Sequence, residues 1–449
     1  MLSPLLDAAH WLHALYDHRR TLRMSRAELE AMQLVKFRRL VKHAQAHSPY
    51  WQRVIAEHRI NPESCVPTDF PVLTKKQITD HFDEMVTDRR ITRADLVRHA
   101  ADPKHAHELY LGEYRVVHTS GTSGMSMYQL FSRRAWRRGA SLITRVTPPF
   151  RFQMRVAYVA STMAFTGGSS LMNAGNQGLN RLLFNVRMYD ACTPMPETVQ
   201  ALNEFQPQTL GGYSMIIQML AEEQLRGALN IRPLHVGVGG EALTTTGRAM
   251  IEKAFGVPVH VTYASTEHLY MGLSLPPDLS MHLMEDDLMF ELHEDHTCIT
   301  NLFGDTLPLI RHRMDDILHE ETDLPPTHLP FRRVTVSGRM ENALFYDNDE
   351  GVRDFVHPLM LTDFIAPSLI GWQAVVTGPT GLTLRLLFEE SASAETRASS
   401  GALVLAQMNR IFKTKRMTRV QVTLEVVESL PVDPKTGKYR LVVNESAAA

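Results

Sequence analysis

Short apolar runs alternate with segments of helical periodicity through the middle of the chain. The apolar runs have the length of buried strands and lie at residues 156–160, 234–238 and 259–263. Segments with apolar residues three and four positions apart separate them, at residues 197–205, 215–226 and 245–255. Strands that alternate with helices are typical of α/β layers on a largely parallel sheet. We therefore expect an α/β fold.

Residues 26–60 are expected to be helical. Ser25 is followed three residues later by Glu28, the spacing of a capping box, and apolar residues then recur at helical intervals. Pro49 is expected to end this helix, because proline has no N–H to donate inside a helix. The pattern then favours an extended segment at residues 70–75 and a short helix at residues 75–85.

The pattern changes again near residue 337. Before this point, further strands are expected at residues 288–292, 298–302 and 309–311. After it, a hairpin around Gly378-Pro379-Thr380-Gly381 precedes a loop, a helix and a strand, at residues 391–400, 401–412 and 420–427. The remaining chain is long enough for a small domain with its own core. We expect a large N-terminal α/β domain at residues 1–337 and a small α+β domain at residues 338–449.

The composition narrows the class of function. Of the 449 residues, 44% are hydrophobic and 21% are charged, as in a globular protein with a sizeable core. The formal net charge of −2 provides no overall basic field to attract nucleic acid. No run is long and apolar enough to span a bilayer. We expect neither a nucleic-acid partner nor a membrane partner.

The cysteines favour a reducing compartment. Cys65, Cys192 and Cys298 lie far apart, which matches neither a disulfide framework nor a Cys-x-x-Cys zinc site. The first twenty residues carry Asp7 and lack the basic start and long apolar core of a signal peptide. A cytoplasmic location is expected.

The most informative motif is a hydroxyl-rich loop between two expected strands, Thr119-Ser120-Gly121-Thr122-Ser123-Gly124. Its glycines permit a tight turn and close approach to a ligand. Its hydroxyl and N–H groups are suited to surround a phosphate. It matches neither the Walker loop nor the dinucleotide fingerprint, because no Gly-Lys-Ser/Thr follows and a strand comes next. Taken alone, the run is better explained as a polar hairpin loop.

Other loop motifs follow it in order. They are Phe165-Thr166-Gly167-Gly168, Gly211-Gly212-Tyr213-Ser214, Gly239-Gly240-Glu241, Tyr263-Ala264-Ser265-Thr266-Glu267, the segment 309–316, Gly338-Arg339 and Asp433-Pro434-Lys435-Thr436-Gly437-Lys438. With the hydroxyl-rich loop, this ordered set resembles the adenylate-forming enzyme superfamily over about residues 26–445. Further features, at Ser48-Pro49-Tyr50-Trp51, residues 70–75 and residues 281–286, resemble the phenylacetate–CoA ligase branch.

The resemblance implies a role for each motif. Thr119 to Gly124 would hold the β- and γ-phosphates of ATP. The adenine would lie between the residues Gly239, Gly240, Glu241, Tyr263, Ala264 and Ser265. Thr266 would reach the α-phosphate and Glu267 would bind Mg²⁺, which prefers oxygen ligands. Asp316 would hold the ribose hydroxyls and Arg339 would lie nearby at the hinge. Lys438 would reach the substrate carboxylate and the α-phosphate from a mobile small domain.

Each role has a plainer alternative. Glu267 also fits an ion pair with a nearby His or Arg, and Asp316 also fits a solvated Asp-Asp pair. Lys438 is also explained as an exposed lysine in a turn, and Arg339 as a charged residue on the surface. Tyr263 fits half-buried strand packing.

The chain departs from the resembled pattern in three places. Met125 and Ser126 stand where Lys or Arg and then Pro usually follow the loop, so a phosphate-neutralising cation is missing. The candidate substitutes are Arg133, Arg134, Arg137 and Arg138. Ala264 replaces a glycine, and the segment ending at Asp316 lacks the glycine that usually shapes its turn. These departures put nucleotide affinity in question.

The resemblance implies ATP-dependent activation of a carboxylic acid as an acyl-adenylate, release of pyrophosphate, and transfer to CoA. Phe165, Tyr213 and Met271 are candidates for an apolar acid pocket. An aromatic acid is favoured only because the family favours one. Two alternatives stay open: transfer to an acyl-carrier protein or an amine, and a non-catalytic adenylate-fold binding protein. The oligomeric state is open, with a homodimer among the options.

Overall fold

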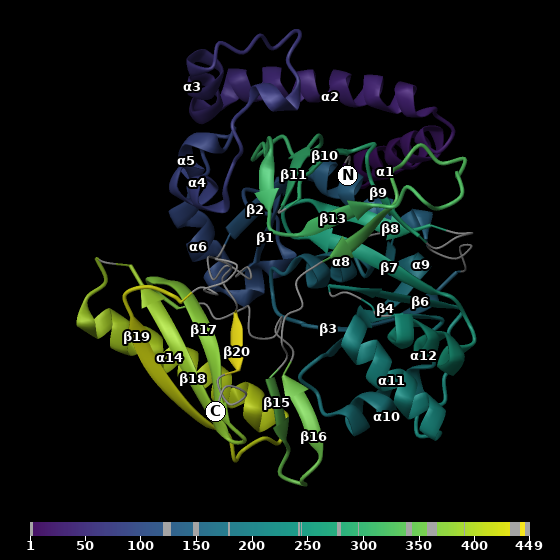
Figure 1. The fold of residues 1–449 in the computed structure, drawn as a ribbon, viewed down its shortest axis with the longest axis vertical. Coiled ribbons are helices and arrows are strands. Elements are labelled where there is room, and N and C mark those ends of the chain that lie inside the picture. The colour runs from purple at the N-terminus through teal and green to yellow at the C-terminus, as the bar shows by residue number, and fades with distance from the viewer. Residues whose placement is uncertain are drawn as a thin grey trace.

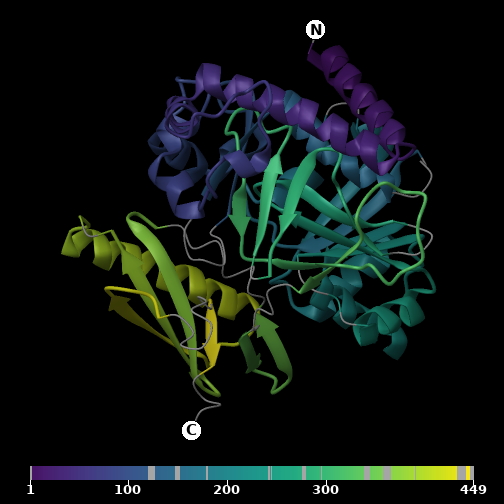
Figure 2. The same cartoon turned by 45° about the horizontal axis from the view of Figure 1, so that its top comes forward.

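The structure is a computed structural model, and its arrangement is seen in two views (Figures 1 and 2). Helices from the N-terminal part lie along one side of a central β-sheet region, and the segment from β15 onward forms a separate block on the other side (Figure 1). The described residues are 3–119, 127–146, 152–177, 180–240, 243, 245–275, 280–294, 296–337, 344–356, 366–389, 391–431 and 441–444.

The N-terminal part is helical, and the helical segment predicted over residues 26–60 is confirmed as α2 and α3. Its elements are α1 (Ser3–Thr21), α2 (Arg26–His47), α3 (Pro49–Glu57), η1 (Pro67–Asp69), α4 (Lys75–Asp80), α5 (Phe82–Met85), α6 (Arg93–Ala101) and η2 (Pro103–His107). The capping box at Ser25 and Glu28 is formed. α2 ends before Pro49, and Pro49 begins α3. In the first turn of a helix the backbone N–H has no partner within the helix, so the N–H that proline lacks is not missed there. The helix expected over residues 75–85 is interrupted at His81.

An antiparallel hairpin flanks the hydroxyl-rich loop. Its strands are β1 (Tyr114–Thr119) and β2 (Met127–Ser132), and α7 (Arg133–Ser141) and η3 (Leu142–Arg145) follow. The prediction of a strand on each side of the loop is confirmed. Residues 120–126, which include most of the loop and Met125, lie outside the described residues.

A mixed sheet of seven strands forms the centre, in the order β4-β3-β5-β6-β7-β8-β9. The strands are β3 (Met154–Ala160), β4 (Phe184–Asp190), β5 (Thr209–Tyr213), β6 (His235–Gly239), β7 (Val259–Ser265), β8 (Leu269–Ser274) and β9 (Met281–Leu283). The helices between them are α8 (Gly167–Gly175), α9 (Asn180–Leu183), α10 (Met195–Phe205), α11 (Ser214–Arg226) and α12 (Thr245–Phe255). The first five strands pair in parallel and the last two in antiparallel fashion, so the predicted α/β fold is confirmed.

Two small antiparallel sheets follow in the chain. One contains β10 (Leu288–Leu292), β11 (Thr297–Asn301) and β12 (His312–Met314), and the other contains β13 (Ile317–Glu320) and β14 (Val334–Ser337). The strand expected at residues 309–311 is wrong, because β12 begins at His312. Arg311 has a φ of 51°, and this left-handed conformation interrupts an extended strand. The apolar residues Leu309 and Ile310 are fully buried outside a strand, so their apolar character reflects burial and not strand pairing.

The C-terminal segment contains two more sheets and one long helix. Its elements are β15 (Leu344–Asp347), β16 (Arg353–Val356), β17 (Leu369–Gly378), β18 (Gly381–Phe388), α14 (Ala394–Thr414), β19 (Gln421–Val427) and β20 (Val442–Asn444). The larger sheet has the order β19-β18-β17-β20. The loop expected over residues 391–400 is wrong. Ser393 caps a helix that starts at Ala394, since its hydroxyl accepts the N–H of Thr396.

The C-terminal segment packs against the central region. One hydrophobic cluster contains Leu210 and Val236 of the seven-stranded sheet and also Trp372 and Leu384 of the C-terminal sheet. Arg416 lies 3.3 Å from the carboxylate of Glu197 on α10. The domain boundary at residue 338 stays a prediction, because residues 338–343 lie outside the described residues.

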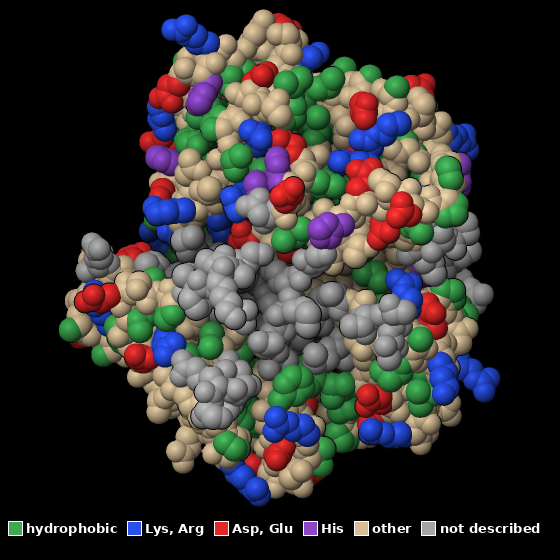
Figure 3. Space-filling view, in the orientation of Figure 1, with side chains coloured by type: hydrophobic (Ala, Val, Ile, Leu, Met, Phe, Trp, Pro, Cys, Tyr) green, Lys and Arg blue, Asp and Glu red, His purple; other side chains and the backbone are tan. Residues whose placement is uncertain are grey.

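Surface charge agrees with the near-neutral composition. On the face shown in Figure 3, basic and acidic side chains of the described residues are intermixed and leave no continuous patch of one sign. Among the helices of the described residues, none combines the length and apolar character that crossing a bilayer requires.

Candidate active site

Two predicted adenine-binding segments lie at neighbouring strand ends. β6 ends at Gly239 and pairs in parallel with β7, so that Gly239 lies opposite Thr262, directly before Tyr263. A Cβ atom on Gly239 would clash with the hydroxyl of Thr262, and Gly240 has a φ of 81°. Close packing against Thr262 therefore favours glycine at position 239, and the left-handed backbone favours it at position 240. In α/β sheets, the carboxyl ends of parallel strands are where ligands bind. Glu241 lies outside the described residues.

The described end of the hydroxyl-rich loop leads to the same region. The backbone N–H of His118 donates a hydrogen bond to the carbonyl of Phe165 at 2.9 Å, one residue before β1 ends at Thr119. α8 starts two residues after Phe165, and a Cβ atom on Gly167 would lie 3.5 Å from the hydroxyl of Thr266. The start of the loop, the start of α8 and Thr266 are thus neighbours.

Glu267 is a buried carboxylate in the turn between β7 and β8. Its residue exposure is 6%. Burial alone would raise its pKa, but the positive charge of Lys75 and the rings of His312 and His268 outweigh this effect and hold the pKa below its ordinary value. Glu267 is therefore ionised at neutral pH. An ionised carboxylate beside a hydroxyl fits Mg²⁺, which usually takes one or two carboxylates together with substrate phosphates.

Lys75 is a site residue that our sequence reasoning missed. Leu73 exchanges backbone hydrogen bonds with the residues around β12, donating to Arg311 and accepting from Arg313 at 3.0 and 2.9 Å. Thr74 then caps α4, whose first residue is Lys75. The extended segment 70–75 thereby carries a cation whose positive charge lowers the pKa of Glu267. The signal in the sequence was the capping box formed by Thr74 and Gln77.

The structure brings Tyr263 and Asp316 into direct contact. The hydroxyl of Tyr263 donates to the carboxylate of Asp316 at 3.0 Å, and Asp316 is 7% exposed. The turn without its glycine therefore still directs Asp316 toward the strand end that carries Tyr263. Their roles toward adenine and ribose stay predictions. Arg339 and Lys438 lie outside the described residues.

The three predicted pocket residues do not form one cluster. Phe165 packs in the N-terminal core, Met271 packs with residues of β10 and β11, and Tyr213 packs against the core of the seven-stranded sheet. Met271 is fully buried. The hydroxyl of Tyr213 accepts a hydrogen bond from the backbone of Ser161. The acid pocket at these residues stays a prediction.

The branch-like segment 281–286 ends in a buried charge network. Asp286 accepts hydrogen bonds from Arg145 at 2.6 Å and from His18 of α1 at 3.0 Å. Asp287 binds Arg138 at 2.7 Å and Lys36 at 3.0 Å. Arg138 was a candidate for the missing loop cation, and the structure gives it this structural partner instead.

Three histidines make the stability of the protein sensitive to acid. Burial lowers the pKa of His118 and of His235 to about 4 and that of His268 to about 3. In the unfolded chain these rings titrate near the ordinary value of about 6.5. Between pH 6 and 4 the unfolded chain therefore binds protons that the folded chain does not, and stability falls as pH falls.

We expect these histidines to take up about three protons from the buffer when the protein unfolds in urea at pH 5. The free energy of unfolding should therefore fall by about 1.4 kcal/mol per histidine for each pH unit by which the pH is lowered in this range. Proton uptake in weak buffer measures this. His268→Gln should reduce the uptake by about one proton, while the exposed His319→Gln should leave it unchanged. Equal uptake by His268→Gln and the unsubstituted protein would contradict the assignment.

Comparison with known proteins supports the fold. No protein-family model matches the chain. Protein CapK of Staphylococcus aureus is 25% identical over 281 residues, which cover 60% of this chain and 60% of CapK. An open conformation of 2-hydroxyisobutyryl-CoA ligase in complex with 2-HIB-AMP and CoA has a TM-score of 0.58 and 17% identity, covering 95% of this chain and 94% of that chain.

The same ligase has also been solved in the thioesterification state with 2-HIB-AMP and CoA. Its TM-score is 0.62 at 18% identity, and the match covers 95% of this chain and 92% of that chain. At these identities the likeness concerns the fold. Because the match spans nearly the full length of both chains, the C-terminal segment is included in it. The chain therefore has the α/β fold, with a separate C-terminal domain, of the adenylate-forming enzymes.

Proposed function

We propose that this protein activates a carboxylic acid with ATP, releases pyrophosphate, and transfers the acyl group from the acyl-adenylate to the thiol of CoA. The observation that carries the proposal is the grouping of Gly239, Tyr263, Thr266, Glu267 and Asp316 at one end of the parallel strands. The solved proteins with this fold include a CoA ligase in complex with an acyl-AMP and CoA.

The chemistry requires no nucleophile from the protein. The substrate carboxylate attacks the α-phosphorus, and pyrophosphate leaves. Two anions must be held together, so positioning and fixed positive charge supply most of the rate. Mg²⁺ on Glu267 would neutralise phosphate charge when bound. Thr266 would hold the α-phosphate, and the hydroxyl-rich loop would hold the leaving phosphates.

Lys75 adds a positive charge that the resemblance did not supply. Its positive charge lowers the pKa of Glu267, and it is carried by a segment that is hydrogen-bonded to the start of β12. Met125 stands where the loop usually has a cation. A lysine near Glu267 is suited to compensate part of that loss, because its ammonium group is a compact point charge on a long stem.

The proposal also specifies the acceptor of the acyl group and the class of carboxylic acid. CoA is favoured over an acyl-carrier protein or an amine because the solved ligase binds CoA. An aromatic acid remains our preference, with Phe165, Tyr213 and Met271 as candidate pocket residues. The phenylacetate–CoA ligase branch is likewise proposed on the segments 48–51, 70–75 and 281–286.

Pyrophosphate release with ATP and Mg²⁺ across a panel of carboxylic acids, with and without CoA, tests the proposal. We expect release that needs one class of acid but not CoA, because adenylation precedes transfer. Lys438→Ala should lose at least about 100-fold of this release, a removal of about 2.7 kcal/mol of transition-state stabilisation. It should still transfer a supplied acyl-adenylate to CoA.

Three other outcomes would change the proposal. Equal loss of both half-reactions in Lys438→Ala would contradict the role of this lysine. Thioester formation with pantetheine as fast as with CoA would favour a carrier protein as the acceptor. Absence of both release and calorimetric binding of ATP with Mg²⁺ would favour a non-catalytic binding protein.

A further inference from the structure

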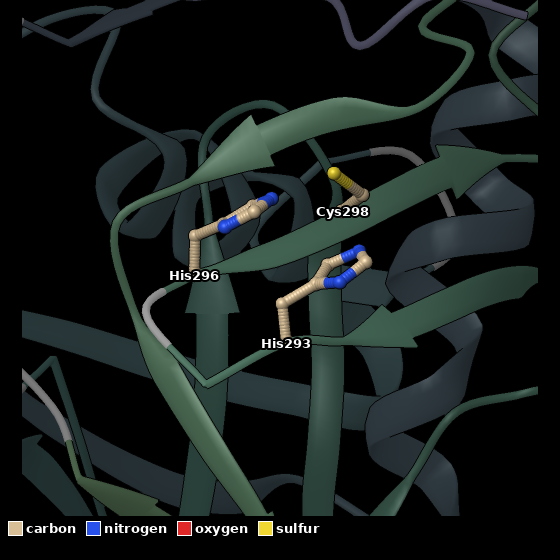
Figure 4. Close-up of side chains that lie close together, drawn as sticks. All are labelled: His293, His296 and Cys298. Carbon is tan, nitrogen blue, oxygen red and sulfur yellow. The ribbon is translucent and has the colours of Figure 1, made fainter.

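Two histidines and a cysteine converge on one side of the β10–β11 hairpin. His293 follows β10, His296 precedes β11, and Cys298 lies within β11. One nitrogen from each ring and the sulfur of Cys298 all lie within 4.8 Å of one another. Figure 4 shows the three side chains on the same side of the hairpin, with the two rings close together beside the sulfur.

The register of the hairpin explains this convergence. The N–H of His293 donates to the carbonyl of His296 at 3.0 Å, so these two residues face each other across the turn. Cys298 lies two residues beyond His296 and therefore on the same face of its strand. It is the cross-strand partner of Glu291, which lies two residues before His293. Strand periodicity thus places all three candidate ligands on one face.

The three side chains have the chemistry and burial of a metal site. Cys298 is fully buried, and the two histidines are half-buried. The rings stack with centroids 4.4 Å apart. Nε2 of His293 is a buried nitrogen without a hydrogen-bond partner in the described structure. A buried ring nitrogen that lacks a partner is unfavourable unless something binds it.

We propose that His293, His296 and Cys298 bind a zinc ion, with a water molecule as the fourth ligand. Zinc prefers imidazole nitrogen and thiolate sulfur, whereas magnesium and calcium prefer oxygen. Tetrahedral zinc separates its ligand atoms by about 3.3–3.6 Å, so ligand atoms within 4.8 Å of one another must approach by at most about 1.5 Å. Glu291 shares the face, but its carboxylate is held by Arg311 at 2.7 Å and is not counted as a ligand.

A second cluster with metal-ligand spacing, formed by His18, Asp286 and Asp287, is not a metal site. His18, Asp286 and Asp287 also have ligand atoms within 4.8 Å of one another. Their carboxylates, however, already bind Arg145, Arg138 and Lys36 at 2.6 to 3.0 Å. These cations occupy the place of a metal, so that cluster is an ion-pair network.

The zinc site has a structural role. Cys298 pairs with Arg313, whereas its neighbour Ile299 pairs with His312. Adjacent residues of a strand point to opposite faces. His312, which contacts His268 beside Glu267, therefore lies on the face away from the zinc ligands. A bound metal joins the β10–β11 turn to the inner strand of the sheet and is expected to raise the thermal midpoint.

The full chain is first treated with a chelator and desalted. One sample is then titrated with Zn²⁺ in competition with a chromophoric chelator, and a second sample is titrated with Co²⁺. We expect one zinc per chain and a raised midpoint, since a ligand bound only by the folded state stabilises it. Co²⁺ should give a thiolate-to-cobalt charge-transfer band. Cys298→Ser and His293→Asn should each weaken zinc binding more than tenfold, because even partners outside the ligand shell are worth about 10–100-fold.

Matched controls keep the test decisive. Cys192→Ser, at a half-buried cysteine on another element, and His319→Asn, at an exposed histidine, should keep zinc affinity and the cobalt band. If Cys298→Ser does not fold, His293→Asn, at a half-buried position, decides the question. The proposal is overturned if the folded protein binds no Zn²⁺, if it binds Cu²⁺ but not Zn²⁺, or if His293→Asn binds Zn²⁺ as tightly as the unsubstituted protein.

Discussion

Glu267→Gln is expected to lower acid-dependent pyrophosphate release at least about 100-fold at low Mg²⁺, and high Mg²⁺ should restore part of the loss. Glutamine keeps the shape of the side chain but removes the negative charge. The carboxylate is ionised at neutral pH, because Lys75 and the neighbouring histidines outweigh its burial. A catalytic metal contributes several kcal/mol to charge stabilisation, which corresponds to more than 100-fold in rate. Release measured across a Mg²⁺ titration checks this.

The alternative is that Glu267 serves only as the ion-pair partner of Lys75. In that case Glu267→Gln and Lys75→Gln would each lower the thermal midpoint, and the double variant would recover much of the loss. The Mg²⁺ dependence of Glu267→Gln would then equal that of the unsubstituted protein, which would refute the role in metal binding. We expect instead a shift in Mg²⁺ dependence for Glu267→Gln that Lys75→Gln does not reproduce.

Asp286→Asn is expected to destabilise the protein by about 3–5 kcal/mol, since it leaves the buried charge of Arg145 without its partner. Asp286 is fully buried, and its contacts join α1 to η3 through His18 and Arg145. Burial opposes ionisation, but the positive charge of Arg145, the hydrogen bond from His18 and the charge of Lys36 keep the pKa of Asp286 well below its ordinary value. Its contribution is therefore present above the ordinary carboxyl pKa and is lost as pH falls through the lowered value.

Urea unfolding and limited proteolysis of α1 measure the effect of Asp286→Asn. The matched control is Asp80→Asn, which removes a carboxylate from an exposed ion pair with Lys76. Exposed pairs contribute about 0–1 kcal/mol, so this control should change stability little. Equal midpoints and equal α1 cleavage in the two variants would show that the buried network does not hold α1 in place.

Much of the fold was predictable because its signals are local. The alternation of apolar runs and helical segments identified the α/β layers, and the helix over residues 245–255 has its predicted bounds. The capping box at Ser25 was predicted correctly because capping depends on residues three positions apart. The loop expected over residues 391–400 is wrong because serine favours loops but is also a strong N-cap, and the cap at Ser393 allows a helix to begin.

The candidate site was predictable only in part. Gly239 and Tyr263 follow successive parallel strands, and such strand ends meet at one edge, so their proximity could be expected. The hydrogen bond between Tyr263 and Asp316 was not predicted, because the two residues lie 53 positions apart in the chain. Lys75 was missed because it lies far from Glu267 in the chain. His293, His296 and Cys298 were missed because spacing rules for zinc were applied to the cysteines alone.

The sequence by itself determined most of the helices and strands of the central sheet, because periodicity and capping act over a few neighbouring residues. Only the tertiary structure decided that the charge of Lys75 acts on Glu267, that His18 meets Asp286, and that Arg138 is already paired. The physical reason is that the energy of a charge depends on which groups surround it after packing, and packing joins residues that are hundreds of positions apart.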